Sequence, residues 1–167
     1  VVLCHGPGFT RRYSNLSHQL RRGCLFNPET FRWSQLQEHW RHEMLSIDAR
    51  ISTIAALRVR PPEYPVFIRP DADSKAFEGG IRSSSEWEVL AAQLPPDLQV
   101  IAASPVRVDA EYRVFMVNSN VVAASEYRRE GQPSINGFVP DDVIDVALRA
   151  DSFWRPADAY VMDIARS

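Results

Sequence analysis

The segment Val66–Ile81, "VFIRPDADSKAFEGGI", decides the fold that we expect for this chain. Its apolar start predicts a strand at residues 66–69, and its Gly79–Gly80 pair precedes a return strand around Ile81. About a dozen residues separate Ile68 from Ile81, whereas hairpin connections usually have about two to five. A connection of this length inside a compact hairpin is typical of a functional or disordered loop.

Lys75 in this loop is the only lysine of the chain, and all other basic residues are arginine. A lysine ammonium is a compact charge suited to phosphate, and glycines let backbone N–H groups approach an anion closely. The segment therefore predicts an anion-binding loop that contains Arg69, Lys75, Gly79 and Gly80. The alternative interpretation is a plain hairpin tip with a solvated lysine.

The composition indicates a globular chain of one domain or two small lobes. It has 167 residues, 45% of them hydrophobic, and a net charge of −2, which argues against a general binder of nucleic acid or membrane surfaces. No apolar run reaches the length of a membrane span, and the start "VVLCHGPGF" lacks the features of a signal peptide. The unclustered Cys4 and Cys24 favour reduced thiols and a cytoplasmic setting.

The first part of the chain predicts a strand followed by helices. Residues 1–9 have the pattern of a buried strand that runs into a Gly-Pro-Gly turn. Asn27 is a favourable N-cap with Pro28 at the first helical position. The apolar face of that helix repeats at helical spacing through Trp33, Leu36, Trp40 and Met44. We expect a second helical stretch at residues 48–57, and a proline-rich connector at residues 58–66 as the best boundary.

The second part mixes hairpins with helices. Ser85 and Glu88 form a capping-box pattern that predicts a helix, and residues 100–106 predict a buried strand. Residues 111–128 predict a hairpin with its turn at residues 118–120. A loop at 131–137, a helix at 140–150 and a last strand at 158–165 follow. Since strands and helices do not alternate regularly, the expected class is α+β.

Several charged residues are candidates for chemistry. Glu111 and Arg113 are two apart on a strand and so share one face, either as an ion pair or as a carboxylate that holds sugar hydroxyls. Arg128 follows in a charged segment, for which the alternative interpretation is a solvated turn. Asp163 interrupts an apolar strand, which is costly unless the carboxylate binds Mg²⁺ or pairs with an arginine. His39 and His42 on one helix are better explained as a solvated face than as metal ligands.

Taken in order, these pieces resemble the ATP-grasp superfamily. "VFIRPDADSKAFEGGI" looks like its strand and phosphate-covering loop, "VIAASPV" is similar to its hinge strand, and "YVMDIA" to the strand that carries the first magnesium carboxylate. The nearest resemblance is to an uncharacterised bacterial and phage group whose strand reads F-x-R-P before K-x-F-x-G. The resemblance covers most of residues 24–166.

The resemblance implies ATP and Mg²⁺ as cofactors and assigns roles to matching residues. Arg69 would lie on the phosphates, and Lys75 would hold the β- and γ-phosphates from a mobile loop that includes Gly79 and Gly80. Backbone groups of the hinge segment would contact adenine; its residues are Ala102, Ala103, Ser104 and Val106.

The remaining matches concern the ribose, the metal and the reacting groups. Glu111 would bind the ribose hydroxyls and Asp163 would bind Mg²⁺. Arg113 and Arg128 would face the transferring phosphate or the acyl phosphate. The implied fold has two α+β lobes with the nucleotide between them, and the implied regions are a partial preceding region at residues 1–60, a smaller lobe at 61–98 and a core lobe at 99–167.

The resemblance implies a carboxylate–amine ligase that forms an amide or peptide bond through an acyl phosphate. Its partners would be carboxylate and amine substrates, small molecules or peptides, without nucleic acid or membrane; a homodimer is compatible with the sequence. One departure stands out, because the family's E-x-N strand after the aspartate is not seen before Ser167. Two alternatives therefore stay open: a non-catalytic nucleotide-binding or interaction domain, and an α+β domain unrelated to ATP.

Overall fold

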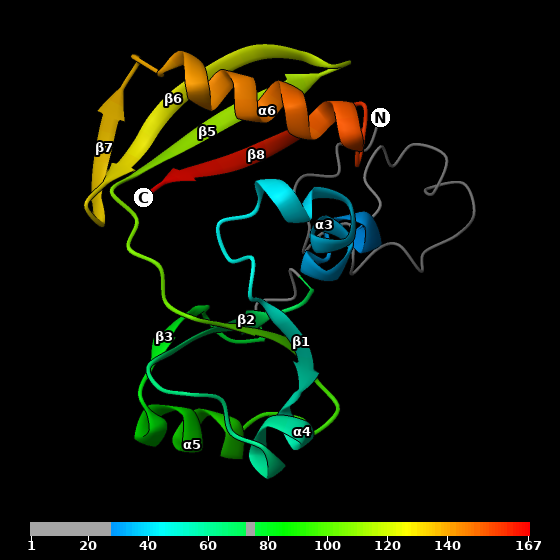
Figure 1. The fold of residues 1–167 in the computed structure, drawn as a ribbon, viewed down its shortest axis with the longest axis vertical. Coiled ribbons are helices and arrows are strands. Elements are labelled where there is room, and N and C mark those ends of the chain that lie inside the picture. Colours follow the sequence, from blue (N-terminus) through cyan, green and yellow to red (C-terminus); the bar gives the residue numbers. More distant parts are fainter. Residues whose placement is uncertain (1–27, 73–75) are drawn as a thin grey trace, which may run out of the picture. The chain divides into compact units, whose positions relative to one another are not determined.

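A computed structural model describes residues 28–72 and 76–167 (Figure 1). The predicted first strand, the Asn27 cap, both cysteines and Lys75 lie outside these residues. The contacts of the chain group it into two units, and we describe each by itself. Unit 1 comprises residues 28–37 and 48–105, and unit 2 comprises residues 38–47 and 106–167. The predicted division at residues 60 and 98 stays a prediction.

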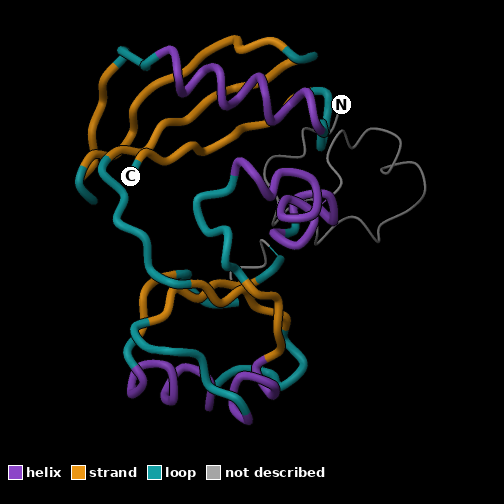
Figure 2. Tube along the Cα trace, viewed as in Figure 1, coloured by secondary structure: helices purple, strands orange, loops and turns teal. Residues whose placement is uncertain are grey.

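Unit 1 is built on a four-stranded antiparallel sheet (Figure 2). Its strand order is β1-β4-β2-β3, and the strands are β1 (Arg50–Thr53), β2 (Val66–Pro70), β3 (Gly80–Arg82) and β4 (Gln99–Ala103). The predicted hairpin of the opening segment is confirmed, because Ile68 pairs with Gly80 across β2 and β3. The central strand β4 pairs with both β1 and β2, so residues 102 and 103 lie at its end.

Helices α4 (Ile54–Val59) and α5 (Ser84–Ala92) cover one face of this sheet (Figure 1). They bury a core in which apolar side chains of both helices meet those of the two central strands; it consists of Ile54, Leu57, Val66, Ile68, Trp87, Ala91, Val100 and Ala102. The opposite face carries a small cluster of Ala49, Ile101 and Ala103, and Trp33 packs against it. Both faces of the sheet are therefore partly covered.

Two predicted boundaries in unit 1 are wrong. The capping box of α5 is formed by Ser83 and Glu86 and not by the predicted Ser85 and Glu88. The run of serines offers the same pattern two residues earlier, so the helix begins earlier than predicted. The stretch predicted as one helix at 48–57 is divided, since β1 pairs with β4 before α4 begins. Thr53 marks the division, as its hydroxyl accepts the N–H of Ala56 and caps α4.

The Trp-rich helix is shorter than its sequence pattern. A 3₁₀ turn η1 (Pro28–Phe31) leads into α3 (Trp33–Trp40), and a second turn η2 (Arg41–Glu43) ends before the extended Met44. The buried Asp71 caps the first turn of α3, because its carboxylate accepts the Ser34 N–H at 2.7 Å and the Ser34 hydroxyl at 3.1 Å. A residue from a distant segment thus satisfies N–H groups that a helix start leaves unpaired.

Unit 2 is a second antiparallel sheet with helix α6 (Asp141–Phe153) across one face (Figure 1). The strand order is β7-β6-β5-β8, and the strands are β5 (Ala110–Val117), β6 (Asn120–Arg129), β7 (Gln132–Asn136) and β8 (Ala159–Arg166). Alternate residues of β5 and β8 are buried on the side of α6, among them Tyr112, Val114, Met116, Tyr160, Met162 and Ile164. The other face of the sheet carries charged side chains of β5 and β8 together with partly exposed apolar ones, such as Phe115 and Val161.

Two tight turns organise this sheet. Asn118 and Ser119 both have positive φ, 47° and 65°, as a two-residue hairpin turn requires, so the predicted turn is confirmed. Glu130 and Gly131 form a second turn of this kind, with φ of 48° and 76°. The predicted loop at 131–137 is therefore wrong, because residues 132–136 form the edge strand β7. This strand accommodates a proline because, among the strands that the structure describes, it pairs with β6 alone.

Residues 38–47 dock on α6 within unit 2. His39 stacks on Trp154 with ring centroids 4.3 Å apart, and the Trp40 indole donates to the Trp154 carbonyl at 3.1 Å. Glu43 forms an ion pair with Arg149, which holds the pKa of the Glu43 carboxyl below its usual value. The histidine is thus part of an aromatic contact. The predicted apolar stripe belongs to both units, Trp33 to unit 1 and Trp40 to unit 2.

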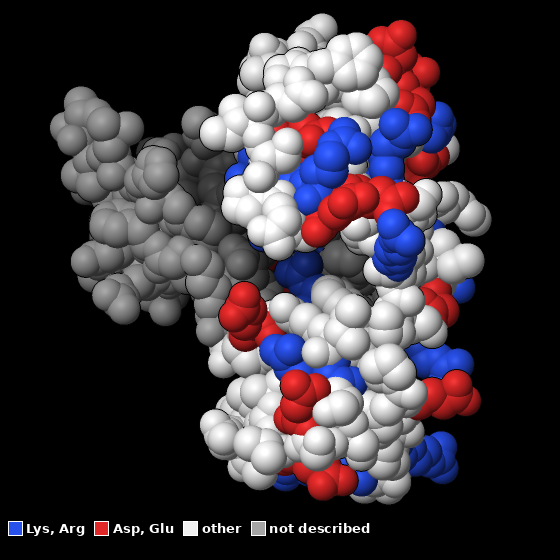
Figure 3. Space-filling view, turned by 90° about the vertical axis from the view of Figure 1, so that its left-hand side faces the viewer, with Lys and Arg blue, Asp and Glu red and all other residues white. Residues whose placement is uncertain are grey.

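Acidic and basic side chains are interspersed on the face that Figure 3 shows, so no field of one sign marks it. Within residues 28–72 and 76–167, no helix combines the length and the apolar character needed to cross a membrane.

Candidate functional site

A group of charged residues lies on the face of the unit 2 sheet opposite to α6. Arg113 on β5 is directly across from Asp163 on β8. Its guanidinium donates from Nε to Oδ1 and from Nη2 to Oδ2, both at 2.8 Å, and this contact raises the pKa of Arg113. Both side chains are about half exposed, 44% and 47%. Of the two alternatives that the sequence left open for Asp163, the pairing with an arginine is confirmed.

Glu111 is the second acid of this face. It shares the face with Arg113, as the two-residue spacing predicts, and lies across from Arg128 on β6. Its carboxylate accepts a hydrogen bond from Tyr127 and forms an ion pair with Arg128 at 3.3 Å. The four charged residues that the sequence singled out in three motifs thus lie on one sheet; they are Glu111, Arg113, Arg128 and Asp163.

Tyr127 joins these charges, and the sequence pattern did not single it out. The Cζ atom of Arg113 lies 4.7 Å from the centre of its ring, and that of Arg128 lies 5.9 Å away. Burial and the hydrogen bond to Glu111 raise the pKa of the Tyr127 hydroxyl, which therefore stays a donor at neutral pH. No sequence signal marked it, because its closeness to Arg113 depends on the pairing of Arg113 with Ser125 across β5 and β6.

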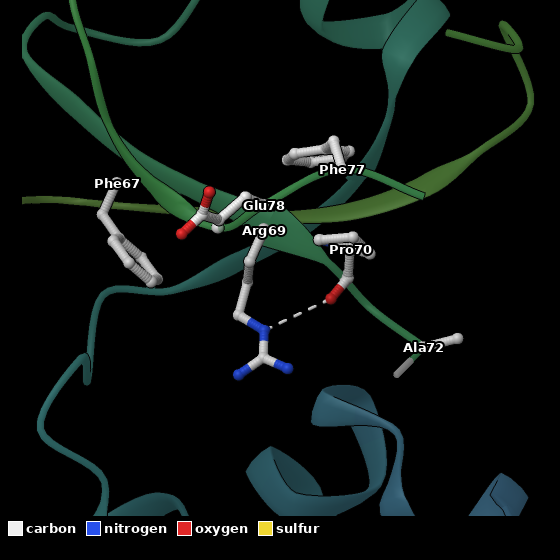
Figure 4. A pocket seen from close by; sticks show the side chains of 7 residues that line it. Phe67, Arg69, Pro70, Ala72, Phe77 and Glu78 are labelled. Atoms are coloured by element: carbon white, nitrogen blue, oxygen red, sulfur yellow. Dashed lines mark hydrogen bonds between the residues drawn. The ribbon is translucent and has the colours of Figure 1, made fainter. Parts of the chain in front are cut away.

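Arg69 lines a pocket of unit 1, of about 510 Å³. Figure 4 shows its side chain extending from β2 into the pocket between Phe67 and Pro70. Its Nε donates to the Pro70 carbonyl at 3.3 Å, and its guanidinium lies over the ring of Trp33, 4.9 Å from the centroid. The pocket combines this arginine with the carboxylate of Glu78 and apolar walls, so a ligand with an anionic group would bind on the side of Arg69.

Gly79 lines the same pocket for a packing reason. A Cβ atom at Gly79 would lie 2.9 Å from the Cβ atom of Arg69, a distance at which something must shift. At Gly80 the nearest atom would be the movable end of the Arg82 side chain, also at 2.9 Å. Gly79 is therefore required by the close approach of its segment to β2, and a role of either glycine at a phosphate stays a prediction.

The predicted hinge residues occupy the end of β4 and the segment that follows. Ala102 is paired on both sides and Ala103 on one. The Ser104 N–H donates to Asp48 at 2.9 Å, and hydrogen bonds from Ser104 lower the pKa of this aspartate. The boundary between the two units falls just before Val106. An adenine that used the Ser104 N–H would displace Asp48, and the contact of this segment with adenine stays a prediction.

The described residues do not by themselves fit a magnesium ion. Nowhere in residues 28–72 and 76–167 do three histidine, cysteine or acidic side chains come close enough together to hold a metal. Asp163 is paired with Arg113, and Glu111 with Tyr127 and Arg128. Mg²⁺ prefers several oxygen ligands in a near-octahedral arrangement. The role of Asp163 as a metal ligand therefore stays a prediction. The role of Lys75 at the phosphates also stays a prediction, because Lys75 lies outside the described residues.

The fold and the family follow from comparisons with known proteins. A D-alanine–D-alanine ligase from Bacillus anthracis superposes with a TM-score of 0.61 at 10% identity, over 81% of this chain and 52% of that one. The ATP-grasp ligase PsnB complexed with a minimal precursor gives 0.56 at 16% identity, over 94% and 57%. PsnB with the minimal precursor, Mg and ADP gives 0.55 at 15% identity, over 82% and 46%.

The chain thus spans about half the length of these solved structures, and at such identities the likeness concerns the fold. Comparison with curated protein sequences gives no match. A family model described as an "ATP-grasp domain", the second family of its clade, matches residues 47–167, most of the chain. The α+β class with two antiparallel sheets agrees with this match. The chain accordingly belongs to this family of ATP-grasp domains.

Proposed function

We propose that this domain binds ATP and acts in an ATP-dependent ligase that joins a carboxylate to an amine. The observation that carries the proposal is the match of residues 47–167 to an ATP-grasp family. The solved structures of similar fold include a D-alanine–D-alanine ligase and the ligase PsnB, one of whose structures contains Mg and ADP.

In the proposed reaction a carboxylate oxygen attacks the γ-phosphorus of ATP, which forms an acyl phosphate and releases ADP. The amine nitrogen then attacks the acyl carbon, inorganic phosphate leaves, and the amine loses a proton. The catalytic task is the positioning of reactants and the stabilisation of phosphate charge, and it requires no protein nucleophile. This agrees with the absence of a nucleophile–base motif in the sequence.

The chain offers cations for that task in each unit. In unit 2, Arg113 and Arg128 would face the transferring or acyl phosphate, with Tyr127 and the two acids fixing their guanidinium groups. In unit 1, Arg69 would contact the phosphates of the nucleotide. Glu111 would accept hydrogen bonds from the ribose hydroxyls. These bonds would replace the hydrogen bond that it now accepts from Arg128. Among the described residues, no group of three acidic, histidine or cysteine ligands assembles for Mg²⁺.

A second candidate is a domain that binds the nucleotide without catalysis or acts as an interaction domain. The bidentate pair of Arg113 with Asp163 favours it, because the guanidinium predicted to contact phosphate and the carboxylate predicted to bind Mg²⁺ form hydrogen bonds with each other. The two candidates share nucleotide binding and differ in turnover.

The experiment is a titration of the intact protein with ATP in the presence of MgCl₂, followed by an assay for ADP release. Hydroxylamine serves as the amine, and a panel of amino acids and short peptides as carboxylates, because hydroxylamine converts an acyl phosphate to a hydroxamate. Hydroxamate and ADP in equal amounts support the ligase. Binding without ADP release supports the second candidate, and no nucleotide binding contradicts both.

A further inference from the structure

Trp33 and Arg69 are neighbours on one face of the unit 1 sheet. The buried residues of β2 alternate with Phe67 and Arg69, which therefore point to the opposite face. On that face Trp33 packs against a cluster that includes Ile101, and Ile101 is the β4 residue directly across from Arg69. The indole thus covers the sheet at the place from which Arg69 extends.

The first turn of α3 holds Trp33 in place. The backbone N–H of Trp33 donates to the carbonyl of Asp71 at 2.9 Å, and the buried carboxylate of Asp71 caps the same turn through Ser34. One turn further along, the Gln37 side chain donates to the carbonyl of Ala49 at 2.7 Å. Asp71 follows β2 directly, two residues after Arg69. The helix that carries the indole is therefore tied to the strand that carries the guanidinium.

The Trp33 indole and the carbonyl of Pro70 both contact the guanidinium of Arg69, the carbonyl through a 3.3 Å hydrogen bond from Nε. Arg69 Cζ lies 4.9 Å from the Trp33 ring centroid, within the range of a cation–π contact. Stacking uses the flat face of the guanidinium, whereas bidentate hydrogen bonds to phosphate use its N–H edge. An arginine on a flexible stem would otherwise lose rotamer entropy on binding, and a contact that restricts it in advance lowers that cost.

We propose that Trp33 is a positioning residue that holds the Arg69 guanidinium ready for the phosphate groups of the nucleotide. The inference rests on the proposed function, since it assumes that the pocket of Arg69 receives nucleotide phosphates. Trp33 acts through Arg69 and touches no reacting atom. Asp71 supports the arrangement indirectly, by fixing the turn from which the indole extends.

The test measures Kd for ATP and for AMP by calorimetry, because their ratio isolates the contribution of the β- and γ-phosphates. Trp33→Leu should lower the preference for ATP about threefold to tenfold, the range expected for a cation–π contact. In an Arg69→Ala background, Trp33→Leu should have no further effect. Trp40→Leu is the matched control, because Trp40 lies on the same helix but contacts Trp154 and Tyr160, and it should keep the parent ratio.

A second measurement keeps the proposal testable if Trp33→Leu fails to fold. Ring-fluorinated tryptophan retains the shape of the indole but weakens the negative face of its ring, and should lower the ATP preference. The same labelling of Arg69→Ala or of Trp33→Phe should leave the ratio unchanged, which assigns the effect to this pair. Trp33→Phe is a clean reference because the Trp33 Nε1 is buried with no hydrogen-bond partner among the described residues.

The outcomes separate this inference from the proposed function. A parent protein that binds neither ATP nor AMP overturns both. A parent that prefers ATP, with a ratio indifferent to Trp33→Leu and to fluorination, overturns the positioning role alone. An equal loss from Trp33→Leu with and without Arg69 also overturns it, because the effect would then be a general loss of structure. A loss that requires Arg69 supports it.

Discussion

Arg113 and Asp163 face each other across β5 and β8 and form two parallel hydrogen bonds of 2.8 Å each. Both side chains are accessible to solvent, and exposed ion pairs contribute little to folding. We therefore expect this pair to contribute little to the free energy of unfolding and more to function, because it fixes the direction of the Arg113 guanidinium.

The first prediction concerns Asp163→Asn. We expect the free energy of unfolding to change by less than about 1 kcal/mol, as for other exposed pairs. ATP turnover should fall about a hundredfold, because a small displacement of a positioned group can cost that much. Urea denaturation and ADP release measure the two effects. Asp142→Asn is the matched control, since Asp142 also pairs with an arginine at 3.4 Å, and equal turnover in both variants would contradict the prediction.

The second prediction concerns Glu111 and the ribose. The parent protein should bind ATP about tenfold or more tightly than 2′,3′-dideoxy-ATP, because each hydrogen bond to a charged group contributes about 1.5–3 kcal/mol. Glu111→Ala should remove this preference. Tyr127→Phe keeps a ring beneath Arg113 but deletes the hydroxyl that orients Glu111, so it should reduce the preference in part. A preference that persists in Glu111→Ala would show that this carboxylate does not hold the ribose.

The third prediction concerns Gly79→Ala. The added Cβ would lie 2.9 Å from the Cβ of Arg69, and such overpacking costs about 1–3 kcal/mol. Gly137→Ala is the control, because a Cβ there meets nothing within 4 Å, and its effect should stay within about 0.5 kcal/mol. Denaturation midpoints compare the two variants. Similar midpoints would mean that β2 and its return segment can move apart at little cost.

The sequence predicted the elements of this fold better than their boundaries. The opening hairpin, the turn at Asn118 and Ser119, and the last strand follow from local signals, because turn chemistry and alternation are visible in short stretches. The strand β1 was missed because its residues are extended through pairing with β4, for example of Arg50 with Ala102, and these two residues are far apart in the chain. The strand β7 was missed because its place in the sheet depends on pairing with β6, as between Glu126 and Asn136, which the sequence does not display.

The candidate site shows the same division. The spacing of Glu111 and Arg113 predicted their common face, and their partners Arg128 and Asp163 were identified one by one. The contacts among them depend on register, which the sequence does not display. Tyr127 was not singled out, and Trp33 was predicted only as part of an apolar helix face, because an aromatic residue beside an arginine looks like any core residue in the sequence.

The fourth prediction is a pH dependence that involves Glu126. This buried carboxylate accepts hydrogen bonds from Arg129 and from Ser134 on β7, and these contacts lower its pKa in the folded state. Its stabilising contribution is therefore present above the ordinary pKa of a glutamate and is lost as pH falls through the lowered value. Glu126→Gln should reduce the urea midpoint at neutral pH, and the difference from the parent should shrink below about pH 4. A difference independent of pH would contradict this linkage.

The fifth prediction returns to Lys75, the single lysine of the chain. Lys75→Ala should weaken ATP binding about tenfold, the contribution of a contact between a charge and a phosphate, and should leave AMP binding unchanged. Lys75→Arg is the sharper variant. A guanidinium is planar and larger than an ammonium, so it should not restore the affinity if the position requires a compact charge.

Arg82→Ala is the control for Lys75, because Arg82 is a basic residue of the same hairpin whose guanidinium donates to the backbone carbonyls of Ile81 and Glu78. It should keep the parent ratio of ATP to AMP affinity. If Lys75→Arg binds ATP as tightly as the parent, the position accepts either cation and the lone lysine carries no information about phosphate. If the two variants Lys75→Arg and Lys75→Ala lose the same affinity for ATP, the position requires the compact charge of a lysine, which the arginines elsewhere in the sequence do not supply.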